Sequence, residues 1–157
     1  MVDFTEALNV KVEDIERPPL APIGYYTFKV SKPPVFDTVG QGRWEVVYFP
    51  LVATEASEDV DPDDLREVGG VSGVRVRKQF MFNKGDDDEA KAGAARTLSN
   101  LRTFLEKHLA MDISGMTLKE AIDSSVGEQC MGEVQHRPNP EDPDNPFLDL
   151  GRTAPVE

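Results

Sequence analysis

Cationic side chains gather in one short segment of this chain that has the composition of a β-strand. Arg75, Arg77 and Lys78 lie within GVRVRKQFMF (residues 73–82), among β-branched and aromatic residues. Because side chains alternate between the two faces of a strand, Arg75 and Arg77 share one face and Lys78 falls on the apolar one. A bulge, or a side chain that reaches water at a sheet edge, would accommodate Lys78.

Two earlier segments, residues 20–30 and 43–54, show the same alternation and add aromatic rings. In the second of them, Val47, Phe49 and Leu51 share an apolar face, so Trp44 and Tyr48 point the other way. The outward side chains of the three segments that carry a ring or a charge are the candidate binding residues: Tyr25, Lys29, Arg43, Trp44, Tyr48, Arg75 and Arg77.

Rings and cations interleaved on one face are suited to a single strand of nucleic acid. Cations neutralise phosphates and release counterions, and flat rings stack on unpaired bases for about 1–3 kcal/mol per base. A second interpretation stays open at this point. Trp44 and Tyr48 could belong to a two-sided core covered by a long helix, with Arg75 and Arg77 paired to the abundant acids.

No catalytic or metal-binding pattern stands out in the sequence, so neither an enzyme nor a cofactor or metal site is expected. In DVDPDDLREVGG, Asp64 and Gly70 occupy the sixth and twelfth positions, where a calcium loop requires Gly and Glu. His108 and His136 have no partner at zinc spacing. Cys130 is expected to be a small core residue.

The predicted elements place these residues on a small, mainly β (α+β) domain. The predicted order is a strand at 20–30, a Pro/Gly turn region at 31–42, a strand at 43–54, a short acidic helix within 61–70, a strand at 73–82, a long helix at 88–110, a short helix, and strands at 128–137 and 147–156.

Helical signals support the middle of that order. The long helix has an apolar stripe at spacings of three and four, and the short helix has a capping box of Thr117 and Glu120. The stripe consists of Ala94, Leu98, Leu101, Leu105 and Leu109. Helices between the third and fourth main strands predict an OB-like antiparallel barrel.

The length of 157 residues suits one domain, here an N-terminal arm (1–19) followed by a single OB-like domain (20–155). The single cysteine excludes an internal disulfide and fits a reducing cytoplasm. No segment is apolar for the roughly 20 residues that a membrane span requires, so no membrane association is expected.

The net charge of -12, from 29 acidic and 17 basic residues, argues against unspecific adhesion to nucleic acid or anionic membranes. The acids are clustered at residues 55–67, 86–89 and 141–144, each in a predicted loop or helix start. The strands between them are neutral or basic. The sequence therefore predicts charge segregation, in which a local cationic face opposes the global charge.

Four blocks of the chain resemble a family of small bacteriophage proteins described as single-stranded DNA-binding or recombination-associated. The blocks, within Ile15 to Pro155, are LAPIGYYTFKV, DVDPDDLREVGGVSGVRVRKQFMF, LRTFLEKHLAMDISGMTLKEAI and GEVQHRPNPEDPDNPFLDLGRTAP. The resemblance implies an OB-type barrel that coats single strands during phage DNA replication or recombination in the host cytoplasm. It supplies no binding residues. The acidic stretch PNPEDPDNPF is followed by LDLGRTAPVE, so it differs from the acidic end of many single-strand binders.

The leading hypothesis is a non-enzymatic, largely sequence-independent binder of single-stranded DNA. Phage or host replication and recombination proteins are candidate partners, and a free sheet edge or the arm could mediate homo-oligomer formation. The alternative hypothesis is an acidic protein-interaction module, either a virion component or an inhibitor of a host nucleic-acid-binding protein. A metal-dependent enzyme that uses the Asp clusters is a third, weaker option.

Overall fold

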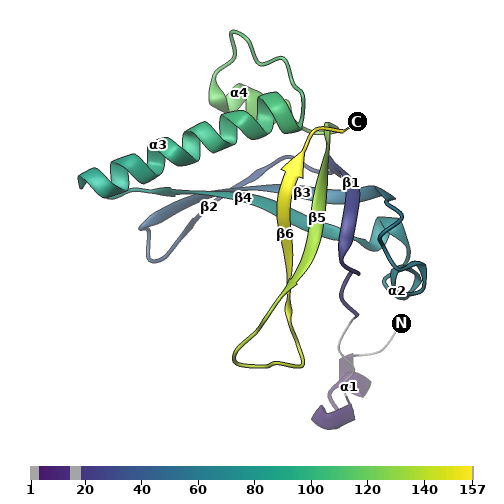
Figure 1. Ribbon diagram of the computed structural model, residues 1–157. Helices are drawn as coiled ribbons and strands as arrows, with labels where there is room; N and C mark the ends of the chain where they lie inside the picture. The colour runs from purple at the N-terminus through teal and green to yellow at the C-terminus, as the bar shows by residue number, and fades with distance from the viewer. Residues whose placement is uncertain (1–3, 15–18, 157) are drawn as a thin grey trace.

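A six-stranded antiparallel sheet is the framework of the computed structural model, which describes residues 4–14 and 19–156 (Figure 1). The strands are β1 (Gly24–Val30), β2 (Val35–Val39), β3 (Trp44–Ala56), β4 (Arg75–Asn83), β5 (Gln129–Arg137) and β6 (Phe147–Ala154). The helical elements are α1 (Phe4–Ala7), η1 (Val12–Asp14), α2 (Pro62–Glu67), η2 (Val71–Gly73), α3 (Asp88–Thr103), η3 (Phe104–His108) and α4 (Leu118–Asp123). The α+β class predicted from the sequence is confirmed.

The long strand β3 organises the sheet because both of its edges are used. One edge pairs with β4, and the other pairs with β2 along its first half and with β1 along its second half. β5 then pairs with β1, and β6 pairs with β5. The sheet is strongly curled, and Figure 1 shows β5 and β6 running across the direction of β3 and β4.

The curled sheet is not closed into a barrel. β4 and β6 approach one another, but among the described residues they form no strand pairing. The outer edges of β4 and β6 are therefore both free, and the closed OB-like barrel predicted from the sequence is not confirmed.

The predicted turn region at 31–42 is wrong for Val35–Val39, which form β2. This strand pairs with residues 44–48 but is exposed over most of its length. Prolines before it and glycines after it are typical of a turn, and its mixed side chains give no alternation of apolar and polar residues. The pairing with β3, rather than any local signal, makes it a strand.

The core lies on the concave face of the sheet and is closed by helices. Phe49 of β3, Phe80 of β4 and Phe104 of η3 form an aromatic cluster, with ring centroids 5.1 to 5.9 Å apart. Edge-to-face and tilted contacts at such distances are favourable beyond the area that they bury. The residues predicted to face inward on β3 are buried, as is Cys130.

The predicted long helix ends in a π-helical turn, η3, which places Phe104 and Leu105 in the core. The predicted apolar stripe is confirmed for its last three leucines but is wrong for Leu98, which is 45% exposed. α3 instead approaches β4 through small side chains, and the Thr97 hydroxyl donates a hydrogen bond to the Met81 carbonyl at 2.9 Å.

The shorter helices follow their sequence signals. Thr117 caps α4 by accepting a hydrogen bond from the Glu120 N–H, and the Glu120 carboxylate accepts one from the Thr117 N–H, so the predicted capping box is confirmed. Asp61 caps α2. In the predicted arm, α1 and η1 are separate short turns, and residues 15–18 lie outside the described part of the chain. No helix in the described ranges has the length and apolar character that crossing a membrane requires.

Candidate functional site

The outer, convex face of β3 and β4 brings most of the predicted site residues into register. Arg77 lies opposite Pro50, and Arg75 lies opposite Val52. Val52 also pairs with Lys29 of β1, so Arg75 and Lys29 flank it in one row across three strands. Directly opposed side chains on one face have Cβ atoms about 4.5–5.5 Å apart. We call this surface the cationic face; it consists of Lys29, Trp44, Tyr48, Pro50, Val52, Arg75, Arg77 and Gln79.

Arg77 and Tyr48 form a stacked pair in the middle of the cationic face. The guanidinium carbon of Arg77 lies 4.7 Å from the centroid of the Tyr48 ring, within the range of a cation–π contact. Tyr48 is half-buried and Arg77 is exposed. A planar guanidinium next to a ring offers both a stacking surface and donors that fit phosphate geometry.

The arginines of this face are not neutralised by the acids of the chain. The ion pairs between described residues involve Arg66, Lys84, Arg102 and Lys119, all of them elsewhere. The helices pack on the opposite face of the sheet, against the buried ring of Phe49, and leave part of Tyr48 exposed. For the described residues, Tyr48 is therefore not enclosed by a helix and Arg75 and Arg77 are not paired with acids, in contrast to the second interpretation of the sequence.

Trp44 stands at the far end of the cationic face. Six residues of extended strand, about 20 Å, separate it from Pro50 opposite Arg77. Its ring lies over the β2–β3 turn, where a side chain on Gly40 would come within 3.1 Å of Trp44 Cδ1. Arg43 is exposed in that turn, beside the ring. Exposed Asp37 of β2 pairs with Val46, which lies between Trp44 and Tyr48 on β3. The positive charge of the face is therefore lower near Trp44 than near Arg77.

Tyr25 points outward on β1, as Lys29 does, but it lies beyond the part of β3 that pairs with β4 and so outside the cationic face. It pairs with Glu133 on β5, and a hydrogen bond from its hydroxyl to the Glu133 carboxylate raises its pKa. Its backbone N–H donates to the Asp59 carboxylate at 3.3 Å, and the Ser57 hydroxyl also donates to Asp59, which lowers the pKa of that carboxyl. The carboxylates of Glu133 and Asp59 would repel a phosphodiester, so Tyr25 is poorly placed to bind nucleic acid.

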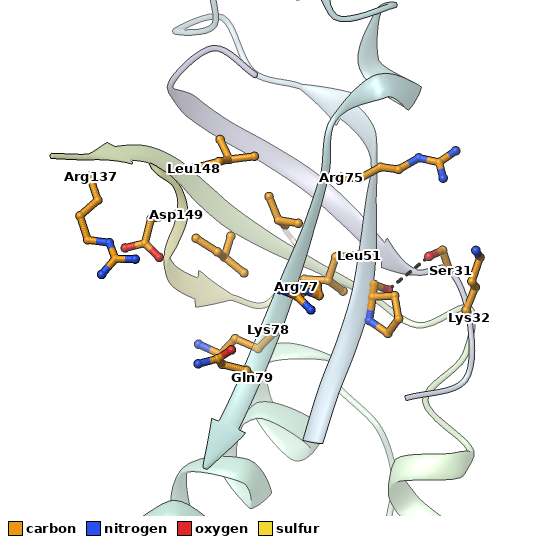
Figure 2. Close-up of a pocket in the computed structure, with 13 residues that line it drawn as sticks. Ser31, Lys32, Leu51, Arg75, Arg77, Lys78, Gln79, Arg137, Leu148 and Asp149 are labelled. Carbon is orange, nitrogen blue, oxygen red and sulfur yellow. Dashed lines mark hydrogen bonds between the residues drawn. The ribbon is translucent and has the colours of Figure 1, made fainter. Parts of the chain in front are cut away.

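A groove between the free edges of β4 and β6, which we call the seam groove, was not identified from the sequence. It has a volume of about 610 Å³, and Figure 2 shows Arg77 and Lys78 on one wall and Arg137, Leu148 and Asp149 on the other. Lys32 and Arg75 also line it, and Figure 2 shows both on the side remote from Leu148 and Asp149. The only sequence signal was Lys78 itself, a cation on the apolar parity of its strand.

Lys78 is half-buried in this groove beside the aromatic cluster. Its Nζ lies 5.6 Å from the Phe80 ring centroid and 5.9 Å from that of Phe104. Burial lowers the pKa of Lys78 and raises the pKa of the neighbouring Cys130 thiol to about 12, so Cys130 is neutral at physiological pH and no ion pair forms between them. Burial and the positive charge of Lys78 together lower the pKa of His108, whose Nδ1 lies 2.7 Å from the Thr153 hydroxyl.

The described residues contain no cluster of His, Cys, Asp and Glu side chains that could hold a metal ion. His136 contacts the Ala21 carbonyl at 2.7 Å, which is a structural contact between β5 and the lead-in to β1. Neither known protein-family models nor curated protein sequences match this chain.

Proposed function

We propose that this protein is a non-enzymatic binder of single-stranded DNA that holds the strand along the cationic face of β3 and β4. The observation that carries the proposal is the Arg77–Tyr48 cation–π pair on a protein with net charge -12. Arg75 and Lys29 flank it and form no ion pair with any described residue. Cations for phosphates and rings for bases are the two requirements of sequence-tolerant single-strand binding.

The strand order supports an OB-like assignment. β2 and β1 occupy successive halves of the same edge of β3, so together they act as one bent first strand. With α3 and η3 between β4 and β5, and β5 returning to β1, the strand order is compatible with an open five-stranded OB-like barrel in which β4 and β6 would be the unpaired neighbours. OB barrels are often partly open and bind oligonucleotides on the face of their second and third strands, which correspond here to β3 and β4.

The setting that we propose is phage DNA replication or recombination in the host cytoplasm, where exposed single strands must be coated. This part of the proposal is supported by the block resemblance to phage single-strand binders. Phage or host replication proteins, and further copies of this chain, are the candidate partners in such a complex.

Fluorescence anisotropy with labelled oligo-dT across a salt series tests the proposal. The wild type should prefer single-stranded to duplex DNA and lose affinity steeply as salt rises. The double substitution Arg75→Glu with Arg77→Glu should weaken binding by at least about tenfold at low salt, because it replaces phosphate neutralisation with repulsion. The matched control is Arg66→Glu with Arg102→Glu, which changes net charge equally on exposed helical sites. Wild-type protein that does not bind at low salt would refute the proposal.

A second candidate function is a protein-interaction module that engages a basic partner. The observation that favours it is the acidic end of the molecule, where α2 and the loop before it expose Glu58, Asp61, Asp63, Asp64 and Glu67. Such a surface attracts basic proteins and can compete for their DNA-binding sites. A pull-down from host lysate with and without nuclease separates the two functions, because a stoichiometric partner that survives nuclease treatment would favour the module.

A further inference from the structure

Lys78 is a half-buried cation that forms no ion pair with an acidic side chain of the described residues. The described residues give its ammonium group no hydrogen bond and no ion pair, only the nearby rings of Phe80 and Phe104. Charges removed from water are normally compensated by an opposite charge or by hydrogen bonds, and ring contacts replace only part of that compensation. Lys78 is therefore positioned to donate to an anion that enters the groove.

The seam groove in which Lys78 lies is cationic as a whole. Lys32, Arg75, Arg77 and Arg137 line it together with Lys78, and Asp149 is the only carboxylate among the lining residues. On the opposite wall, where the end of β5 pairs with the start of β6, the guanidinium carbon of Arg137 lies 5.0 Å from the Phe147 ring centroid, a second cation–π pair like that of Arg77 and Tyr48. The groove also runs between two unpaired strand edges, which expose backbone N–H donors.

We propose that the seam groove is a second binding subsite for single-stranded DNA, in which Lys78 donates to a phosphate and the Arg137–Phe147 pair supports an adjacent base. The inference rests on the proposed function and adds a path: the strand leaves the cationic face over the edge of β4 and crosses to β6. Arg75 and Arg77 line the groove and also belong to the cationic face, so the two surfaces are continuous.

An acidic peptide added to a free strand edge is the competing occupant, because such edges accept extended segments. The stacked Arg137–Phe147 pair favours nucleic acid over that occupant. A peptide strand obtains its affinity from main-chain hydrogen bonds and has no need of a ring platform, whereas an unpaired base stacks on one.

The substitution Lys78→Met tests the subsite, because methionine keeps the apolar body of the side chain and removes only the charge. Binding to oligo-dT should weaken by about tenfold at low salt, as expected for the loss of one charge-assisted hydrogen bond. The slope of log K against log salt should become shallower by about 0.7, the value for one single-strand phosphate contact. Lys78→Arg should retain most of the affinity. Lys91→Met, on the exposed side of α3, is the matched control and should leave the affinity and the slope unchanged.

A chemical footprint gives an independent measurement on the wild-type protein. Reductive methylation followed by mass spectrometry should show that oligo-dT protects Lys78, while Lys91 stays equally reactive. If wild-type binding is intact but Lys78→Met binds with the same affinity and salt slope, the subsite is overturned and the proposed function stands. If the wild type does not bind DNA, both fall. Protection of Lys78 by polyglutamate but not by oligo-dT would overturn the nucleic-acid assignment in favour of an acidic peptide.

Discussion

The Arg77–Tyr48 pair shows how a strongly acidic chain can hold a local cationic platform. Contact with the ring limits the conformations of the Arg77 side chain, so less conformational entropy is lost when a phosphate or base binds. The arginine in turn covers part of the ring, so that a base can stack on the combined surface. Neither residue needs a carboxylate partner to stay in place, which leaves the charge free for a ligand.

Tyr48→Ala should weaken binding to oligo-dT by about tenfold, within the 1–3 kcal/mol typical of one stacked base. The salt slope should stay unchanged, because no phosphate contact is removed. Tyr48→Phe should bind almost as the wild type does, since the ring alone carries the effect. Anisotropy titrations at several salt concentrations measure both quantities. Tyr25→Ala is the control, and a loss at Tyr25 as large as at Tyr48 would contradict the placement of the site.

Lys78 should lower the stability of the folded protein at neutral pH, because its folded pKa lies below the unfolded value. Between the folded and the unfolded pKa of Lys78, the unfolded chain binds more protons than the folded one, so the free energy of unfolding rises with pH. Below the folded pKa, the full cost of burying the charged ammonium group is present. Lys78→Met should therefore melt at a higher temperature than the wild type at pH 7, with a smaller difference near pH 10. Thermal unfolding followed by circular dichroism at both pH values checks this. An equal difference at both would show that packing, not charge, is responsible.

Alternation along the strands was enough to place Trp44, Tyr48, Arg75 and Arg77 on one face, because each strand has a clearly apolar opposite face. For Tyr25 it gave the outward face but not the acidic neighbours, Glu133 and Asp59. The pairing of β1 with β3 shifts register between Thr27 and Phe28, and β3 extends beyond its pairing with β4. Both features place the start of β1 in an acidic region, and neither is visible in the local sequence. The seam groove could not be predicted either, since it depends on two strands that come together without pairing.

The helices and strands with a strong periodic or capping signal were predicted from the sequence. The strand whose local sequence resembles a turn, β2, was not. α4 begins at its capping box, and α3 begins where the acidic run predicts. β2 was missed because its strand character comes from β3. The curl of the sheet follows from register and from bulges, which a single sequence does not reveal.

α4 offers a direct test of how a cap supports the core. Thr117→Ala should lower the free energy of unfolding by about 1 kcal/mol, the usual effect of losing an N-cap hydrogen bond. The loss should reach the whole domain, because Ala121 and Ile122 of α4 are buried in the core. Chemical denaturation measures it. Thr103→Ala is the matched control, since that exposed hydroxyl only bonds back to the Ser99 carbonyl of its own helix, and it should be neutral.

The charge distribution of the entire chain has a consequence for encounter with DNA. The acids lie mainly in loops and helix starts rather than on the strands of the cationic face, so a polyanion is repelled by most of the surface and less by those strands. Replacing exposed Glu58, Glu67 and Glu141 with Gln should raise the association rate constant for oligo-dT at low salt. The gain should vanish at high salt, where a Debye length of a few ångströms screens remote charges. Stopped-flow mixing measures the rate, and an equal gain at high salt would contradict a long-range effect.

The position of Trp44 allows its intrinsic fluorescence to report on DNA binding. It is the single tryptophan of the chain, half-buried over the β2–β3 turn at the end of the cationic face that is remote from Arg77. Its emission should respond only when a ligand extends along the face as far as that turn. Oligonucleotides of increasing length should therefore bind without any spectral change until the bound strand is long enough to quench the indole, and that threshold length measures the footprint of the protein without a label.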